Sequence, residues 1–468
     1  MAFKKNQCVT VEINDLTDLG FGVGRIDGAV IFVSDTVPGD VCEVKIIKVN
    51  KTYLVGRVEK YVKKSDARVT DRCSERLCKS CAYKNISYER EAEYKEEGVR
   101  RLFSTSSLSG ITTAPITVSP NETRYRNKAQ YPIALVGGEY KVGFFAPKSH
   151  RVTPVCDCPL TPLVFSQICD ELCLYFKENG LSVYNEESGD GLLRHVYLRR
   201  GEISGEILLT VVINGDKLPN ENALVKRMTE RLTERFPSIV GVLINVNKEN
   251  TNVVLGDNYR TLFGRDYIYD TLAGVRLKIT APSFYQVNHS SAELLYAKAK
   301  ELAKPEKSDT LLDLFCGAGS IGLSMADSVG ELIGIEIVDS AVECAKENAR
   351  DSGIDNAYFF TGDATETERL LANAERQLGR KITPDIVILD PPRAGCDERL
   401  VRFVSTLNAK RIVYISCNPK TLARDVVIFR ECGYDTDTVY PFDLFPCTGH
   451  VESVVCLTRR LDNELPLA

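Results

Sequence analysis

The second half of this 468-residue chain alternates short apolar runs with amphipathic segments, and that alternation constrains the fold more than any other feature. Five apolar runs have the length and composition of buried strands: Leu311–Phe315, Glu331–Ile337, Ala357–Phe360, Ile386–Leu389 and Arg411–Ile415. Helical patterns lie between them, at residues 320–328 and 341–351. Strands that alternate with helices form a mostly parallel sheet, which binds its ligand at the carboxyl ends of the strands. We therefore predict an α/β, Rossmann-like domain over residues 271–468.

A glycine-rich turn and three acidic residues are expected at those carboxyl ends. The turn Asp313–Ser320 joins the first strand to a helix, and its glycines let the backbone pass close to a ligand. Glu336 ends the second strand, Asp363 follows the third and Asp390 follows the fourth. Glu336 can accept hydrogen bonds from both hydroxyls of a ribose and Asp363 from an adenine amino group, and no basic residue lies near the turn to hold a pyrophosphate. The pattern favours an adenosine ligand without phosphates, of which S-adenosylmethionine is the obvious one.

A cysteine and a carboxylate lie at the edges of two further strands. Cys417 follows the fifth strand in the turn Ser416–Pro419, and Glu452 comes 35 residues later. A thiolate that adds to C6 of a pyrimidine makes C5 nucleophilic, and a base must then remove the C5 proton. This chemistry needs one cysteine with a lowered pKa and one carboxylate. A buried structural thiol is the alternative for a cysteine taken alone.

Five ordered motifs resemble the RNA uracil-C5 methyltransferases over residues 277–457. They are Phe284–Asn288, the Asp313–Gly319 turn, Asp390–Arg393, Ser416–Pro419 and His450–Glu452. The resemblance implies that Cys417 is the nucleophile and Glu452 the base. It also implies S-adenosylmethionine contacts from Gln286, Phe315, Glu336 and Asp390, with Ser320 and Asp363 as further contacts. Phe284 and Gln286 would hold the target uracil, which must leave its stack to reach the thiol.

The first 62 residues have the pattern of a small five-stranded, OB-like barrel of the kind that binds oligonucleotides. Short alternating runs are separated by turns, at Gln7–Ile13, Ala29–Val33, Val41–Val49 and Leu54–Lys60. We interpret Gly20–Arg25 as a tight turn, because it does not lie between a strand and a helix. The alternative is a barrel used only for packing.

Cysteines cluster in the next segment, and the chain has 16 in total. Cys73, Cys78 and Cys81 lie in one short loop, and Cys156 or Cys158 offers a distant fourth thiol. Four thiolates bind zinc or an iron–sulfur cluster, and the spacing does not decide between them. Within the family, the 23S rRNA branch carries an N-terminal TRAM barrel and a [4Fe–4S] cluster whose distant ligand precedes proline. That resemblance implies Cys73, Cys78, Cys81 and Cys158 as ligands.

Residues 63–270 are predicted to form a mixed α+β central domain, with a helix at about 88–106 that packs on the catalytic domain. The segment Arg124–Arg151 holds six Lys or Arg residues against one acid, with tyrosines and phenylalanines between them. Such a segment suits an RNA backbone and unpaired bases. Four further residues are expected to extend it: Arg194, His195, Arg199 and Arg200.

The composition limits the cellular location and the function that the chain can have. No apolar run approaches the ~18 residues of a membrane span, and no secretory signal is evident, so we expect a cytoplasmic protein without an obligate protein partner. The formal net charge of −5 requires an RNA-binding chain to concentrate its positive charge locally. The expected function is methylation of a 23S rRNA uridine at C5. The alternatives are tRNA methylation by the same chemistry, amino-group methylation, and a non-enzymatic RNA-binding iron–sulfur protein.

Overall fold

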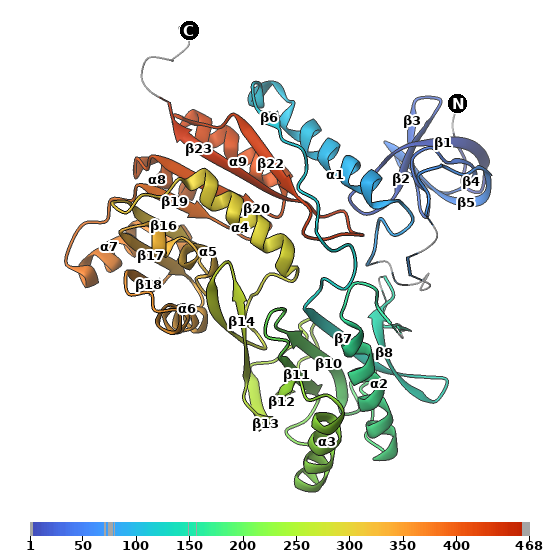
Figure 1. Ribbon diagram of the computed structural model, residues 1–468. Coiled ribbons are helices and arrows are strands. Elements are labelled where there is room, and N and C mark those ends of the chain that lie inside the picture. The colour runs from blue at the N-terminus through green and yellow to red at the C-terminus, as the bar shows by residue number, and fades with distance from the viewer. Residues whose placement is uncertain are drawn as a thin grey trace.

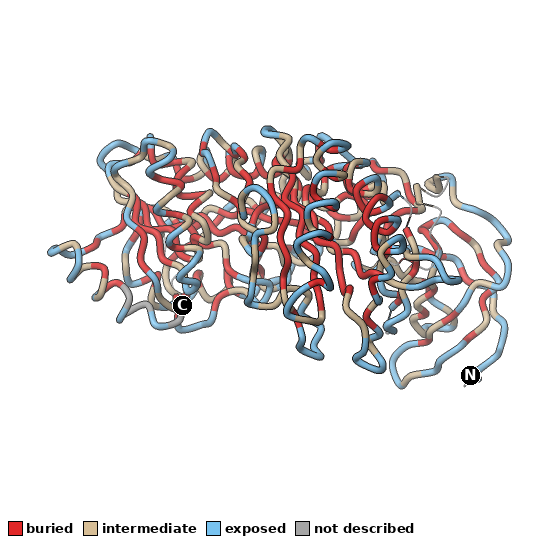
Figure 2. Tube along the Cα trace, turned by 90° about the horizontal axis from the view of Figure 1, so that it is seen from below, coloured by how far each residue is buried: buried red, intermediate tan, exposed pale blue. Residues whose placement is uncertain are grey.

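A computed structural model describes residues 3–69, 72–73, 78, 80–147, 149–155 and 157–460. Three β units follow one another along the chain: a barrel, a seven-stranded sheet and a nine-stranded sheet flanked by helices (Figure 1). Buried residues run through the strands of all three units, and exposed residues lie mainly at the loops (Figure 2). No helix in the described ranges is long and apolar enough to cross a membrane.

The N-terminal unit is a closed barrel with the strand order β1-β2-β3-β5-β4, which confirms the predicted OB-like module. Its strands are β1 (Cys8–Leu16), β2 (Gly22–Ile26), β3 (Ala29–Val33), β4 (Val41–Val49) and β5 (Tyr53–Lys63). Alternate residues point inward and form a small apolar core, including Ile13, Ile31, Val44 and Ile46, all fully buried.

The interpretation of Gly20–Arg25 as a turn was wrong from Gly22 onward, because Gly22–Ile26 forms strand β2. Glycines alternate there because the inward face has no room for side chains. A Cβ at Gly22 would lie 2.0 Å from the hydroxyl oxygen of Thr36, and a Cβ at Gly24 would lie 2.4 Å from a methyl carbon of Val11. Glycine within a strand thus marks a close approach of neighbouring elements.

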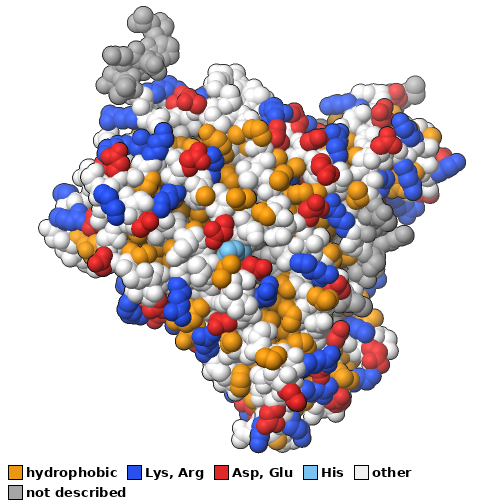
Figure 3. Space-filling view, viewed as in Figure 1, with side chains coloured by type: hydrophobic (Ala, Val, Ile, Leu, Met, Phe, Trp, Pro, Cys, Tyr) orange, Lys and Arg blue, Asp and Glu red, His pale blue; other side chains and the backbone are white. Residues whose placement is uncertain are grey.

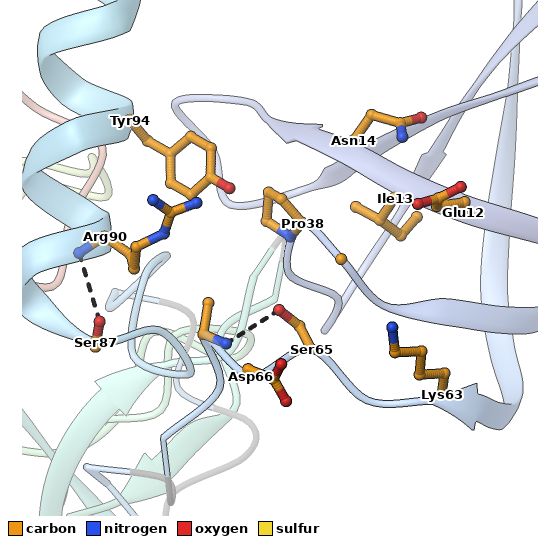
Figure 4. Close-up of a pocket in the computed structure, with 12 residues that line it drawn as sticks. Glu12, Ile13, Asn14, Pro38, Lys63, Ser65, Asp66, Ser87, Arg90 and Tyr94 are labelled. Atoms are coloured by element: carbon orange, nitrogen blue, oxygen red, sulfur yellow. Dashed lines mark hydrogen bonds between the residues drawn. The ribbon is translucent and has the colours of Figure 1, made fainter.

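Helix α1 (Tyr88–Phe103) connects the barrel to the C-terminal unit. Ser87 caps its N-terminus by accepting a hydrogen bond from the backbone N–H of Arg90. The helix contacts α9 (Pro419–Glu431) and β22 (Thr438–Phe442) of the last sheet, and a short 3₁₀ turn (Ser106–Leu108) follows. A groove of about 580 Å³ lies between α1 and the barrel, with Tyr94 and Arg90 on one side and Asn14 and Lys63 on the other (Figure 4).

The central unit is a sheet with the order β13-β12-β11-β10-β7-β8-β9. Its elements are β7 (Lys128–Val136), β8 (Glu139–Phe145), β9 (Val152–Pro154), α2 (Leu163–Glu178), β10 (Leu193–Arg200), β11 (Ile207–Ile213), α3 (Glu221–Arg235), β12 (Ile239–Val246) and β13 (Asn258–Gly264). Three of the residues expected to track RNA lie inside this unit: Arg194, His195 and Arg199 are 2–4% exposed. That expectation was wrong for them, because β10 is a central strand.

A hairpin of β14 (Tyr267–Leu272) and β15 (Val275–Thr280) leads into the predicted Rossmann-like domain. Strands β18-β17-β16-β19-β20 are parallel, and the antiparallel β23 extends them. Beyond β23 come β22 and β6 (Thr112–Thr113), a strand from the linker after α1. The elements are α4 (His289–Ala303), β16 (Thr310–Leu314), α5 (Ser320–Leu323), a 3₁₀ turn (Ala326–Ser328), β17 (Glu331–Glu336), α6 (Asp339–Asp351), β18 (Ala357–Thr361), a 3₁₀ turn (Ala364–Glu366), α7 (Thr367–Leu378), β19 (Ile386–Leu389), α8 (Glu398–Thr406), β20 (Arg411–Ser416), β21 (Tyr434–Asp435) and β23 (Glu452–Arg459).

The helix expected over residues 320–328 is only one α turn, α5, followed by the 3₁₀ turn. Two apolar clusters form the core of this domain. Because these strands are parallel, the carboxyl ends of β16, β17, β19 and β20 lie together at one edge of the sheet.

Candidate active site

A cavity of about 860 Å³ opens at the carboxyl ends of these strands. Eight of the predicted site residues line it: Phe284, Gln286, Phe315, Glu336, Asp363, Asp390, Cys417 and Glu452. They come from segments up to 168 positions apart, and the parallel sheet brings their strand ends to one edge. Ser320 does not line the cavity. Its hydroxyl lies 2.8 Å from the hydroxyl of Tyr296, within hydrogen-bonding distance.

The glycine-rich turn holds the backbone in conformations that open one end of the cavity. Phe315 has φ +65°, an uncommon left-handed conformation for a bulky residue, and Gly317 and Gly319 follow with φ +55° and +81°. The turn reads G-x-G-x-x-G through Gly322, which is also the spacing of dinucleotide sites. The spacing alone therefore does not select an adenosine ligand without phosphates.

Glu336 is fixed at this end of the cavity by two backbone hydrogen bonds. Its carboxylate oxygens accept from the N–H groups of Gly317 and Val338, each at 3.0 Å. The carboxylate thus ties the glycine turn to the end of β17 and faces the cavity. A pre-oriented acid at this position suits the two hydroxyls of a ribose.

Cys417 lies between the end of β20 and the first residue of α9. The Ser416 hydroxyl and the Asn418 side chain, which caps α9 through the Lys420 N–H, hold this turn. A helix N-terminus favours a thiolate. Even so, the pKa of Cys417 is raised to about 11, mainly by burial and then by Glu452 and Asp390, with Arg393 opposing. The lowered thiol pKa that the chemistry requires is thus not present in the described state.

The pairing of β20 with β23 brings Glu452 to Cys417. Ser416 is opposite Ser453 in this antiparallel pair, so the two functional residues lie at the same end of neighbouring strands. Burial raises the pKa of Glu452 to about 8, and Asp390 adds to that shift while Arg393 opposes it. A carboxyl group with a pKa near neutrality is poised to exchange a proton at physiological pH.

Asp390 and Arg393 complete the polar wall of the cavity. Burial raises the pKa of Asp390 to about 7. The Arg393 guanidinium donates to Nδ1 of His450 at 2.9 Å, and the Arg393 carbonyl accepts from the Asn418 amide at 3.0 Å. Arg393 therefore connects the Asp390 turn to the Cys417 turn, and its charge lowers the pKa of both Cys417 and Glu452.

The central unit holds the segment that carries Phe284 and Gln286. The amide of Asn127 donates to the Gln286 carbonyl at 2.8 Å, and its backbone N–H donates to the Val287 carbonyl at 3.0 Å. Arg199 donates to the carbonyls of Ala281 and Ser283. Side-chain placement in the cavity thus depends on contacts from a different domain.

The next residue along this segment, Tyr285, is anchored by a buried acid. Its hydroxyl donates to the carboxylate of Asp270 at 2.8 Å. Asp270 also accepts from the backbone N–H groups of Glu202 and Ile203 in the β10–β11 turn. Because Asp270 lies in β14, the hydrogen bond from Tyr285 connects the β14–β15 hairpin to the segment that carries Phe284 and Gln286.

The lining residues that were not predicted as site residues include Arg126, Lys128, Arg393, Phe445 and His450. Arg393 and His450 lie inside motifs that the sequence singled out, so their motif position was an available signal. Phe445 had none. Arg126 and Lys128 were part of the basic segment, but a charge run does not reveal which of its members enter a cavity.

The four predicted cluster cysteines line a second, smaller cavity of about 280 Å³. Cys73, Cys78 and Cys81 come from one loop and Cys158 from another, while Cys156 lies outside the described residues. The pKa of Cys81 lies well above its ordinary value, first because of burial and then because of neighbouring thiols. Within the described ranges, no group of three or more Cys, His, Asp or Glu side chains is arranged to hold a metal ion. The predicted metal site is therefore not shown.

A glycine-rich turn, acids at successive strand ends and a Rossmann-like sheet together fit the class of S-adenosylmethionine-dependent methyltransferases. The profile of the family described as tRNA (Uracil-5-)-methyltransferase matches residues 231–460, and that of the TRAM domain matches residues 2–58. An uncharacterized RNA methyltransferase of Halalkalibacterium halodurans is 37% identical over 456 residues, which are 97% of each chain. A similar protein of Lactococcus lactis is 36% identical over 460 residues, 98% of each.

A solved structure resembles the whole chain. The Pyrococcus abyssi tRNA (uracil-54, C5)-methyltransferase, in complex with S-adenosyl-L-homocysteine, superposes with a TM-score of 0.77 and 26% identity. The match covers 96% of this chain and 100% of that one. This chain therefore belongs to the RNA uracil-5-methyltransferase family, uses S-adenosylmethionine and carries an N-terminal TRAM domain.

Proposed function

We propose that this enzyme methylates C5 of a uridine in 23S rRNA through a covalent adduct between Cys417 and C6 of the base. The mechanism is supported by one observation: Cys417, Glu452 and the glycine-rich turn line the same cavity. The Cys417 thiolate adds to C6, and C5 then takes the methyl group as the sulfonium becomes a thioether. Glu452 removes the C5 proton, and elimination restores the C5–C6 double bond and the thiolate.

Two substitutions test this mechanism. Cys417→Ala removes the nucleophile, so labelled methyl transfer and the protein–RNA adduct are both lost while S-adenosylmethionine still binds. Glu452→Gln keeps the nucleophile but not the base, so an adduct with methylated RNA accumulates on a denaturing gel. Substantial turnover by Cys417→Ala would exclude the covalent route. Absence of S-adenosylmethionine binding by the unaltered enzyme, measured by calorimetry, would favour a non-enzymatic RNA-binding protein.

The choice of 23S rRNA rests on the joint presence of the TRAM barrel and four thiols that line one cavity. The alternative, tRNA, is supported by the structural similarity to a tRNA methyltransferase. Mass spectrometry of both RNAs from a strain that lacks the gene separates them. Loss of 5-methyluridine from 23S rRNA alone supports the proposal, and loss from tRNA alone contradicts it.

We also propose that Cys73, Cys78, Cys81 and Cys158 hold a [4Fe–4S] cluster. All four thiols line one cavity, and four cysteine thiolates are the ligand set of a [4Fe–4S] cluster. When bound, the cluster would tie two distant loops together, and the methyl transfer itself requires no electrons.

Metal analysis after anaerobic purification tests the cluster. We expect about four iron and four sulfide per chain, with loss of iron in Cys158→Ser. Cys344→Ser, on α6 and outside this cavity, is the matched control and retains the iron. One zinc per chain would show that these thiols bind zinc and not an iron–sulfur cluster. A chain without either metal would mean that the thiols are structural.

A further inference from the structure

Two positively charged side chains lie between the catalytic cavity and the cysteine cavity. Arg126 and Lys128 line both of them. Between them is Asn127, whose bonds to the carbonyls of Gln286 and Val287 fix this segment against the predicted uracil-binding residues. The two cations are thus held at a defined place beside the reaction site.

The charge of this pair is not compensated by acids in the part of the chain that the structure describes. Neither Arg126 nor Lys128 forms an ion pair there, and Nε of Arg126 is buried without a hydrogen-bond partner. Arg199, opposite Lys128 in the β7–β10 pair, adds a third cation that is bonded to carbonyl groups. Arg124, by contrast, makes a two-pronged pair with Asp157 at 2.5 and 2.6 Å.

Clustered cations beside a cavity constitute a binding site for anions. On the face seen in Figure 3, Lys and Arg side chains lie among Asp and Glu side chains. A uridine that enters the catalytic cavity brings the phosphates on its 5′ and 3′ sides to the walls of that cavity. Phosphate contacts from Arg and Lys set the position of a nucleic acid without reading its sequence.

We propose that Arg126 and Lys128 bind the backbone phosphates next to the target uridine and so hold the extruded nucleotide in register with Cys417. This inference rests on the proposed RNA methylation. It distinguishes these two residues from the other described residues of the basic segment, each of which lines at most one of the two cavities. The competing role for the pair is to offset the negative charge of thiolates in the cysteine cavity.

The test uses the full-length enzyme, purified anaerobically, with the single variants Arg126→Gln and Lys128→Gln. Binding of an unmodified 23S rRNA transcript is measured by filter retention at several KCl concentrations, without S-adenosylmethionine. Loss of one phosphate contact lowers the slope of log K against log[KCl] by about 0.7 and weakens binding roughly tenfold. Lys226→Gln is the charge-matched control, because Lys226 is an exposed residue of α3 that lines neither cavity.

We expect both variants to show the reduced slope while iron content and S-adenosylmethionine affinity stay unchanged, and Lys128→Arg to restore the slope. An unchanged slope in both variants, or loss of iron with RNA affinity intact, would overturn the proposal. Methylation of the same transcript by the unaltered enzyme is measured in parallel. If that methylation is absent, the proposed function fails independently of the salt slopes, which still report phosphate contacts.

Discussion

Replacing Lys95 by methionine tests how helix α1, which follows the barrel, supports the segment of Asp443 and Phe445 beside the catalytic cavity. The Lys95 ammonium is 1% exposed and donates to the carboxylates of Glu91 at 2.7 Å and Asp443 at 2.8 Å, both of them fully buried. It also donates to the Phe445 carbonyl at 3.2 Å. Phe445 lines the catalytic cavity, so one ammonium links α1 to a cavity wall.

The magnitude follows from the burial of all three groups. Removal of Lys95 leaves two buried carboxylates without their cation, which costs about 3–5 kcal/mol of unfolding free energy. Burial already raises the pKa of Glu91 to about 7, with Lys95 opposing the shift. Without Lys95, Glu91 therefore stays protonated to higher pH. The destabilisation of Lys95→Met is consequently larger at pH 8 than at pH 6.

Urea unfolding followed by circular dichroism measures this effect, because the chain lacks tryptophan. Arg100→Met on the same helix is the control. Arg100 pairs with Glu96 and Glu97 at the surface, where solvent screens the charges and such pairs contribute little. If Lys95→Met lowered the unfolding free energy no more than Arg100→Met does, the buried ion network would not stabilise the fold as argued.

Three further predictions concern the cavity and the glycine turn beside it. Because the pKa of Glu452 is raised to about 8, kcat/KM rises with pH through about 8 if the carboxylate is the base, and a flat profile would contradict that role. The folded state also holds this proton more tightly than the unfolded state, so the Glu452 contribution to stability falls as pH rises from about 4.5 to 8. Glu452→Gln removes that pH dependence in urea titrations. Gly319→Ala places a Cβ 3.1 Å from the Phe359 ring at φ +81°, which costs about 1–2 kcal/mol and weakens S-adenosylmethionine binding measured by calorimetry. Gly353→Ala, with φ +69° and open space around it, carries the backbone strain alone and leaves that binding unchanged.

The β-α-β pattern predicted much of the catalytic domain because its strands are continuous apolar runs and its acids follow them directly. Position after a strand is enough to place Glu336 and Asp390 at one edge, since all strands of a parallel sheet point the same way. The same logic failed for Gly22–Ile26, where glycines at a crowded barrel wall resemble a turn. It also failed for Arg194 and Arg199, because charge in the sequence does not reveal burial in a central strand.

The sequence alone determined the kinds of chemistry available: a thiol after one strand, a carboxylate before another, and a glycine turn for an adenosine ligand. Each of these depends on local residue order. Tertiary structure decided which groups meet. The antiparallel register of β20 and β23 sets Ser416 opposite Ser453 and so brings Cys417 to Glu452, and burial in the shared cavity raises both pKa values. Strand pairing and desolvation arise only from long-range packing, which is why no local pattern predicted them.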